Sequence, residues 1–199
     1  MPNVKRHALG ERDSAAFVAT ILGPAIVTLL HLFTDVFAPM LAVQCAFVEM
    51  ITGRRAGADD MEPLSWELFQ RAAQIDATRS ELNMGTLQGV ARMLVTWCAQ
   101  YDFVLTPALA EAPVKHGVIN SRSSDPMADF ERSGHFTPYT AGMNISGSPA
   151  ISLPLYHRDD LDLPVGVQII GQPAAEGDLL ALSAQLEAAL PWHDRRAAI

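Results

Sequence analysis

The chain has 199 residues, with 14 Lys or Arg against 22 Asp or Glu, so its formal charge at pH 7 is −8. This length is typical of one domain. The basic residues occur singly or in pairs, whereas binding of phosphates needs clustered Lys and Arg, so we expect no nucleic-acid partner. Cys45 and Cys98 show no metal-ligand spacing, which favours buried thiols and a cytoplasmic location.

The first apolar stretch, residues 15–34, contains no Asp, Glu, Lys or Arg and is long enough to span a bilayer. Gly23-Pro24 interrupts it, and no signal-peptide cleavage pattern follows. We therefore expect two buried helices that break at Gly23-Pro24, and a membrane anchor through residues 15–34 is the alternative. A second apolar stretch follows over residues 36–51.

Two helices are predicted in the next part of the chain. Pro63 follows a polar turn and marks the start of the first, because a missing N–H is tolerated in the first turn of a helix. Thr78 and Glu81 have the spacing of a capping box, which predicts where the second begins. Its apolar stripe runs from Leu87 to Cys98 at helical spacing.

The hydrophobic pattern changes after residue 100. Three short apolar segments rich in β-forming residues predict buried strands at residues 101–107, 150–154 and 164–171. Residues 108–140 show little periodicity and predict a long irregular stretch. The last element is a helix that begins near Glu176, carries leucines along one face and ends at Pro191.

Apolar strands interleaved with helices predict the α/β class, with helices packed around a small mixed sheet and covering both of its faces. Three strands would leave unpaired backbone groups at both edges of that sheet. The sequence therefore predicts part of a sheet, whose edges either pair with a further segment or permit self-association.

Four motifs in a fixed order resemble the C-terminal region of the amidase signature family. They are Tyr101-Asp102-Phe103-Val104-Leu105-Thr106-Pro107, Phe136-Thr137-Pro138, Asn144-Ile145-Ser146-Gly147-Ser148-Pro149-Ala150-Ile151-Ser152-Leu153-Pro154 and Leu163-Pro164-Val165-Gly166-Val167-Gln168-Ile169-Ile170-Gly171. Upstream, Glu62-Pro63-Leu64-Ser65-Trp66 resembles bacterial members, including the branch that hydrolyses cyclic dimers of nylon oligomers. The resemblance covers residues 42–199 and implies one incomplete amidase domain over residues 1–199, with residues 1–41 as a weakly matched apolar helical segment.

The resemblance implies hydrolysis of carboxamide C–N bonds by a Ser-Ser-Lys triad, without a metal or cofactor. In the family the triad lies in the N-terminal half, around a Gly/Ser-rich signature, and no such signature occurs in these 199 residues. We therefore expect a partial amidase fold that lacks its N-terminal strands, carries no catalytic residue and is inactive alone. Its small-molecule amide substrate would bind only after completion. The alternative is a non-catalytic binding or assembly segment that completes a separate N-terminal half.

Asn144, Gly147 and Gln168 are the predicted substrate-binding residues. The resemblance places their segments near the active site, where a small residue lets the backbone approach the substrate and an amide can orient it. Structural roles explain them equally well: Asn144 would satisfy a turn, Gly147 would supply a positive φ, and Gln168 would bond across a strand end.

Other chemically capable residues form weaker patterns. Lys115 precedes the serine pair Ser123-Ser124, but no glycines flank that pair, which favours a solvated loop. Asp59-Asp60 and Asp159-Asp160 lie in predicted turns, where solvated pairs are more common than cation sites. The histidines show no ligand spacing, so we expect no metal site.

Overall fold

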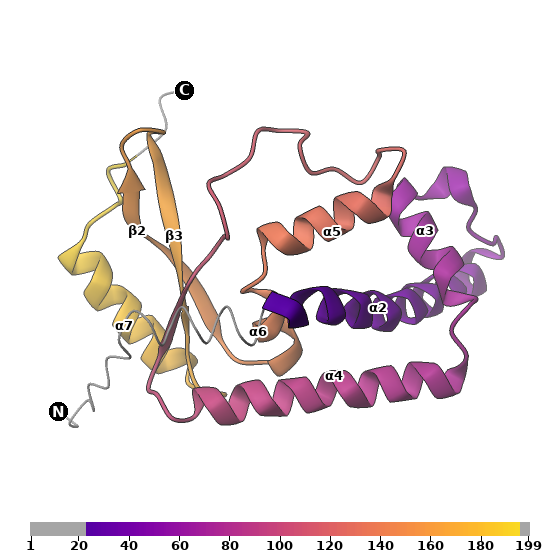
Figure 1. Cartoon of the computed structure of the whole chain (residues 1–199), viewed down its shortest axis with the longest axis horizontal. Coiled ribbons are helices and arrows are strands. Elements are labelled where there is room, and N and C mark those ends of the chain that lie inside the picture. Colours follow the sequence, from indigo (N-terminus) through magenta and orange to yellow (C-terminus); the bar gives the residue numbers. More distant parts are fainter. Residues whose placement is uncertain (1–22, 196–199) are drawn as a thin grey trace. The chain divides into compact units, whose positions relative to one another are not determined.

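The computed structural model describes residues 23–195 of the chain (Figure 1). Its elements are α2 (Gly23–Thr52), a 3₁₀ turn η2 (Ala58–Asp60), α3 (Pro63–Ala72), α4 (Ala77–Cys98), β1 (Val104–Pro107), α5 (Pro126–Phe136), α6 (Ala141–Ser146), β2 (Ala150–Arg158), β3 (Leu163–Ile170) and α7 (Glu176–Ala189). They form two compact units. Within the described residues the first unit comprises residues 23–89 and 113–136, and the second comprises residues 90–112 and 137–195.

Helix α2 of the first unit differs from its prediction. It begins at Gly23 and continues without a break through Pro39 to Thr52, so the predicted second apolar stretch is part of this same helix. The helix expected before Gly23 lies outside the described residues. Burial is confined to the turn around Val36 and Ala38, while the C-terminal half of α2 exposes large apolar side chains. The prediction of buried helices concerned residues 15–34, and for residues 36–51 the sequence indicated only an apolar stretch.

An ion-pair cluster fixes the buried turn of α2. Asp35 is buried, and its Oδ1 accepts a hydrogen bond of 2.8 Å from Nε of Arg71 on α3. Its Oδ2 accepts one of 2.9 Å from Arg79 on α4. Residues Leu29–Thr52 are long and apolar enough to cross a membrane, but Asp35 lies within this span and needs both arginines as partners. This observation favours packing of that turn against protein.

The next two helices begin at different local signals, a proline for α3 and a capping aspartate for α4. α3 begins at Pro63, as predicted. α4 begins at Ala77, because Oδ1 of Asp76 accepts the N–H of Arg79 at 2.8 Å, so the predicted capping box at Thr78 is wrong by two residues. The apolar stripe of α4 is confirmed, since its residues from Leu87 to Cys98 are half-buried or buried.

Helix α5 was not predicted, because its sequence lies within the stretch expected to be irregular. Asp125 caps it by accepting the N–H of Ala128 at 3.0 Å, and Pro126 occupies the first helical position. The helix contacts α2 and α3 within the first unit (Figure 1).

The second unit contains a three-stranded sheet in the order β1-β3-β2. This confirms the α/β class. Both strand pairs are antiparallel, and not mixed as predicted. For β2 and β3 this follows from the four-residue turn over residues 159–162, which is too short for a parallel crossover. β2 extends to Arg158, well beyond its predicted end, and its register with β3 shifts between Leu153 and Tyr156.

One face of this sheet forms the core of the second unit against α7. Leu153, Ile169 and Leu179 are its buried members. Half-buried apolar side chains surround them: Phe103, Ile151, Leu155, Leu182, Leu186 and Trp192. The opposite face carries Gln168 and, two residues further along β3, Ile170; both side chains are buried, so this face is covered as predicted, but it is not uniformly apolar.

Candidate functional site

A row of three polar side chains crosses the second face of the sheet. Gln168 on β3 is paired in register with Thr106 on β1 and with Ser152 on β2. Directly opposed residues of neighbouring strands point to the same face. The row therefore displays an amide between two hydroxyl groups, on the side away from the apolar core.

Gln168 is buried, and its amide group is held in a fixed orientation. Nε2 donates hydrogen bonds to Oγ1 of Thr106 at 3.0 Å and to the backbone carbonyl of Tyr139 at 3.2 Å. Both hydrogens of the amide are therefore used. Thr140, the residue after Tyr139, is the N-cap of α6, so this contact places the start of α6 beside the polar row.

The segment after α6 is a tight turn with a buried serine. Gly147 has φ +70° and ends the helix, and its N–H donates to the carbonyl of Met143 at 3.0 Å. Ser148 is buried, and its N–H donates to Oγ of Ser146 at 3.3 Å. The two serine hydroxyl oxygens lie 3.2 Å apart. This turn leads directly into β2.

The three predicted residues thus share one unit but have different environments. Gln168 is buried in the polar row, Gly147 supplies the positive φ that ends α6, and Asn144 is exposed on α6. Thr106, Ser152 and the Tyr139 carbonyl were not predicted. Polar residues at alternate positions within apolar strands could have indicated the first two, since period two places them on one face.

The chemistry available at this site is hydrogen bonding by neutral groups. In the part of the chain that the structure describes, the side-chain hydrogen bonds of Ser146 and Ser148 link the two to each other and reach the carbonyl of Met143. A serine hydroxyl needs a neighbouring base to become a nucleophile. The polar row and the neighbouring serine turn can therefore orient the amide of a substrate, but the contacts of these residues include no base.

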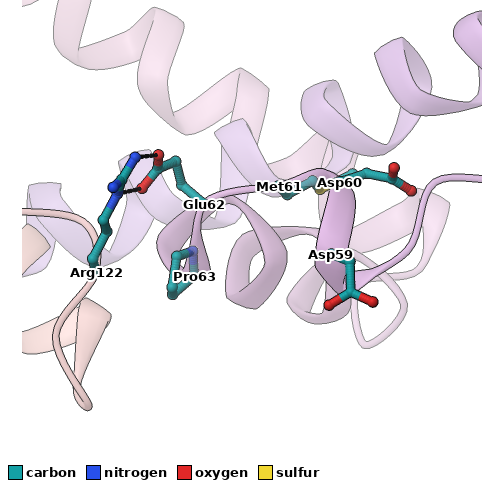
Figure 2. A pocket seen from close by; sticks show the side chains of 6 residues that line it. All are labelled: Asp59, Asp60, Met61, Glu62, Pro63 and Arg122. Atoms are coloured by element: carbon teal, nitrogen blue, oxygen red, sulfur yellow. Dashed lines mark hydrogen bonds and ion pairs between the residues drawn. The ribbon is translucent and has the colours of Figure 1, made fainter.

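A shallow hollow of about 420 Å³ in the first unit is lined by charged residues (Figure 2). The lining residues are Asp59, Asp60, Met61, Glu62, Pro63 and Arg122. Arg122 donates two hydrogen bonds to the carboxylate of Glu62, of 2.7 and 2.5 Å. Figure 2 shows that Asp59 and Asp60 point in different directions. The carboxylates therefore do not converge on one point, as a cation site would require.

The ion pairs also set the protonation of these carboxylates. The hydrogen bonds from Arg122 and then from Ser121 hold the pKa of Glu62 below its ordinary value of 4.5. The side chain of Arg54 and then the N–H of Gly57 likewise lower the pKa of Asp60 from 3.8. Both carboxylates thus remain charged at neutral pH, each with an arginine as partner.

The remaining candidates from the sequence have local partners. Ser123 accepts the N–H of Asp125 at 3.2 Å, beside the start of α5, and the carbonyl of Lys115 accepts the N–H of Val118. Asp160 pairs with Arg158 in the turn between β2 and β3. Over residues 23–195, no three His, Cys, Asp or Glu side chains gather as metal ligands would.

A larger hollow of about 780 Å³ lies between α2 and α3 in the first unit. Cys45 and small residues of α2 form one side, and Trp66 and Phe69 of α3 form the other, with ring centroids 5.5 Å apart. Cys98 lies outside this hollow, and burial raises the pKa of its thiol.

The polar row is formed by the segments in which the sequence resembles a known family, and comparison with known proteins agrees. The sequence model of the amidase family matches residues 65–180. The chain belongs to the amidase family. The 6-aminohexanoate-cyclic-dimer hydrolase of Paenarthrobacter ureafaciens is 34% identical over 155 residues, which cover 73% of this amidase chain and 31% of that protein.

Solved structures give the same relationship. A 6-aminohexanoate cyclic dimer hydrolase complexed with substrate matches with a TM-score of 0.71 at 27% identity, over 85% of this chain and 36% of that one. A bacterial aryl acylamidase of the amidase signature family has the same fold, with a TM-score of 0.65 at 22% identity over 84% of this chain and 34% of its own. This amidase chain thus spans about a third of the length of the relatives it matches.

Proposed function

We propose that this chain supplies the C-terminal part of a hydrolase of carboxamide C–N bonds, and that its 199 residues do not hydrolyse amides alone. The single observation that supports this is the polar row at Gln168, which lies in the family's motifs and whose contacts include no base. The nucleophile, its base and the oxyanion donors would come from the part of the amidase fold that the relatives have in addition.

In this proposal the chain contributes binding and orientation. The fixed amide of Gln168 holds the Tyr139 carbonyl and the start of α6 in place, and the positive φ of Gly147 turns the backbone into β2. Asn144 offers an exposed amide on α6 to a polar substrate group. Correct orientation of a substrate amide against a nucleophile lowers the barrier because it removes the entropy cost of alignment.

The substrate is proposed to be a small carboxamide in the cytoplasm. Two of the relatives are a 6-aminohexanoate-cyclic-dimer hydrolase and an aryl acylamidase, which act on a cyclic amide and on aryl acylamides. Both classes contain an uncharged amide bond, which suits a neutral hydrogen-bonding row. Cys45 and Cys98 are free thiols, in agreement with a reducing compartment.

The test is complementation. The chain alone is assayed with the 6-aminohexanoate cyclic dimer and with 4-nitroacetanilide, and then again after co-expression with the part of the Paenarthrobacter ureafaciens hydrolase that the chain does not match. We expect no turnover alone and turnover after complementation. Turnover by the chain alone that one of its own serines abolishes would contradict the proposal, and so would absence of turnover from a stable complex.

A matched pair of variants tests the polar row in the complemented enzyme. Gln168→Leu removes the orienting amide, and we expect kcat/KM to fall at least about tenfold, because misplaced groups lose alignment with the reacting bond. Gln185→Leu exchanges an exposed glutamine of α7 and serves as the control. Equal activity of the two variants would remove the polar row from the proposed site.

A further inference from the structure

The C-terminal half of α2 carries a regular line of exposed apolar side chains. Met40, Val43, Phe47 and Met50 follow one another at spacings of three, four and three residues. Their exposed fractions are 46%, 69%, 61% and 81%. We call these four residues the α2 seam. This spacing is that of the contact positions by which one helix packs along another element.

The seam is not the side of α2 that contacts α3. That side is formed by Pro39, Ala42, Cys45 and Glu49, which line the hollow between the two helices. At about 100° per residue, the two sets point in directions roughly 125° apart. The seam is thus a second apolar surface of α2, and two further exposed residues at its borders, Phe37 and Ile51, widen it.

We propose that the α2 seam is the surface on which the rest of the amidase fold docks. This inference rests on the proposed function. The chain covers 31% and 36% of the two cyclic-dimer hydrolases, and in the solved one 85% of the chain finds its counterpart at a TM-score of 0.71. In such a relative, a similar fold therefore exists together with a larger body of additional polypeptide. That polypeptide is the occupant to which the seam is assigned.

Two other occupants fit the seam less well. Each copy of this chain has a charge of −8, so two copies repel each other at long range. A bilayer would have to accommodate Glu49, which follows Val48 in the same turn of α2, and a charged side chain in lipid is costly. A polypeptide partner can instead supply apolar groups to the seam and leave Glu49 at its edge.

The test measures binding without activity. The probe is the part of the Paenarthrobacter ureafaciens hydrolase that the chain does not match, immobilised through a tag, and the full 199-residue chain is titrated onto it. Phe47→Glu is expected to weaken the Kd at least tenfold, because a carboxylate would be buried against apolar groups. Leu180→Glu on α7 is the control, since Leu180 is 63% exposed and Phe47 is 61% exposed. We expect its Kd to equal that of the wild type.

A covalent fusion of probe and chain through a flexible linker provides a second measurement that does not depend on affinity. Phe47→Glu should lower the Tm of the fusion but leave the Tm of the isolated chain unchanged. Equal effects of Phe47→Glu and Leu180→Glu, or no effect of the seam exchange in either format, would overturn the proposal.

Two further arms identify other occupants. If the isolated chain is a dimer in light scattering and Phe47→Glu makes it a monomer, a second copy covers the seam and the proposal is wrong. If the chain floats with phosphatidylcholine vesicles and Phe47→Glu does not, a bilayer covers the seam and the proposal is also wrong. Restored hydrolysis without seam dependence would refute the docking surface alone, whereas seam-dependent binding without hydrolysis would refute the proposed function alone.

Discussion

Each of the two units of the chain is stabilised by a different kind of interaction. In the second unit, Ile169 and Leu179 are buried in a core shared by β3, β2 and α7. In the first unit, a carboxylate paired with two arginines occupies the buried turn of α2, and the C-terminal half of that helix exposes large apolar side chains. Apolar sequence alone therefore does not predict burial, because the second unit provides a covering element for its apolar residues and the first unit does not.

The largest effect is expected in the core of the second unit. Ile169→Ala should lower the free energy of unfolding by about 3 to 4 kcal/mol, since it removes a side chain that is only 1% exposed and leaves a cavity. Leu105→Ala is the control, because Leu105 is the cross-strand partner of Ile169 and is 61% exposed. Urea unfolding measures both, and similar losses would show that this core is not the main source of stability.

The ion-pair cluster of the first unit is the counterpart of that core. Asp35→Asn should cost about 2 kcal/mol, because two arginines lose a charged acceptor at a buried position and part of the loss is screened by solvent. Thermal unfolding measures this loss. Arg54→Gln removes an exposed pair with Asp60 and should change the Tm much less. If the two variants behaved alike, Asp35 would not be a key contact of the first unit.

A close backbone approach on the polar face of the sheet predicts a slightly smaller effect. A Cβ at Gly166 would lie 2.9 Å from Oγ of Ser152 and 3.0 Å from Cβ of Ala108. Gly166→Ala should therefore destabilise the chain by about 1 to 2 kcal/mol through overpacking. Ser152→Ala in the same chain should recover part of this loss in urea unfolding. Additive losses would mean that Ser152 is not the obstructing group.

The smallest effect concerns the pH dependence of the exposed pair in the first unit. Arg122→Gln should raise the pKa of Glu62 towards 4.5, because the hydrogen bonds from Arg122, which lower it most, are lost while the one from Ser121 stays. Since the folded pKa is lowered, the pair stabilises the fold above pH 4.5 and this contribution disappears as the pH falls through the lowered pKa. Carboxyl NMR titration measures the shift, and Arg54→Gln should leave Glu62 unchanged.

Local patterns predicted the elements whose signals are local. The start of α3 at Pro63, the apolar stripe of α4, the three strands and α7 follow from proline placement and hydrophobic period. α5 was missed although Asp125-Pro126 is a helix-start signal, because the surrounding Ser- and Gly-rich sequence was interpreted as irregular. The start of α4 was misplaced for another reason: Asp76 and Thr78 are both capable caps, and only Asp76 accepts the bond.

The candidate site was predictable only in part. Gln168 and Gly147 were recognised, and the structure confirms the positive φ of Gly147 and the hydrogen bonding of Gln168. Their binding roles remain predictions. The partners of Gln168 lie 29 and 62 residues away in sequence, so they follow from strand register and not from spacing. A sequence pattern does not contain that information.

Pro39 of α2 has a consequence for how this helix opens. Proline has no N–H, so the backbone carbonyl of Asp35, four residues earlier, receives no helical hydrogen bond from it. The missing backbone hydrogen bond thus involves the same residue whose carboxylate is paired with two arginines. When that carboxylate is removed, α2 should divide into two shorter helices at this turn. Amide hydrogens at the turn should then exchange with deuterium before those in the middle of either helix.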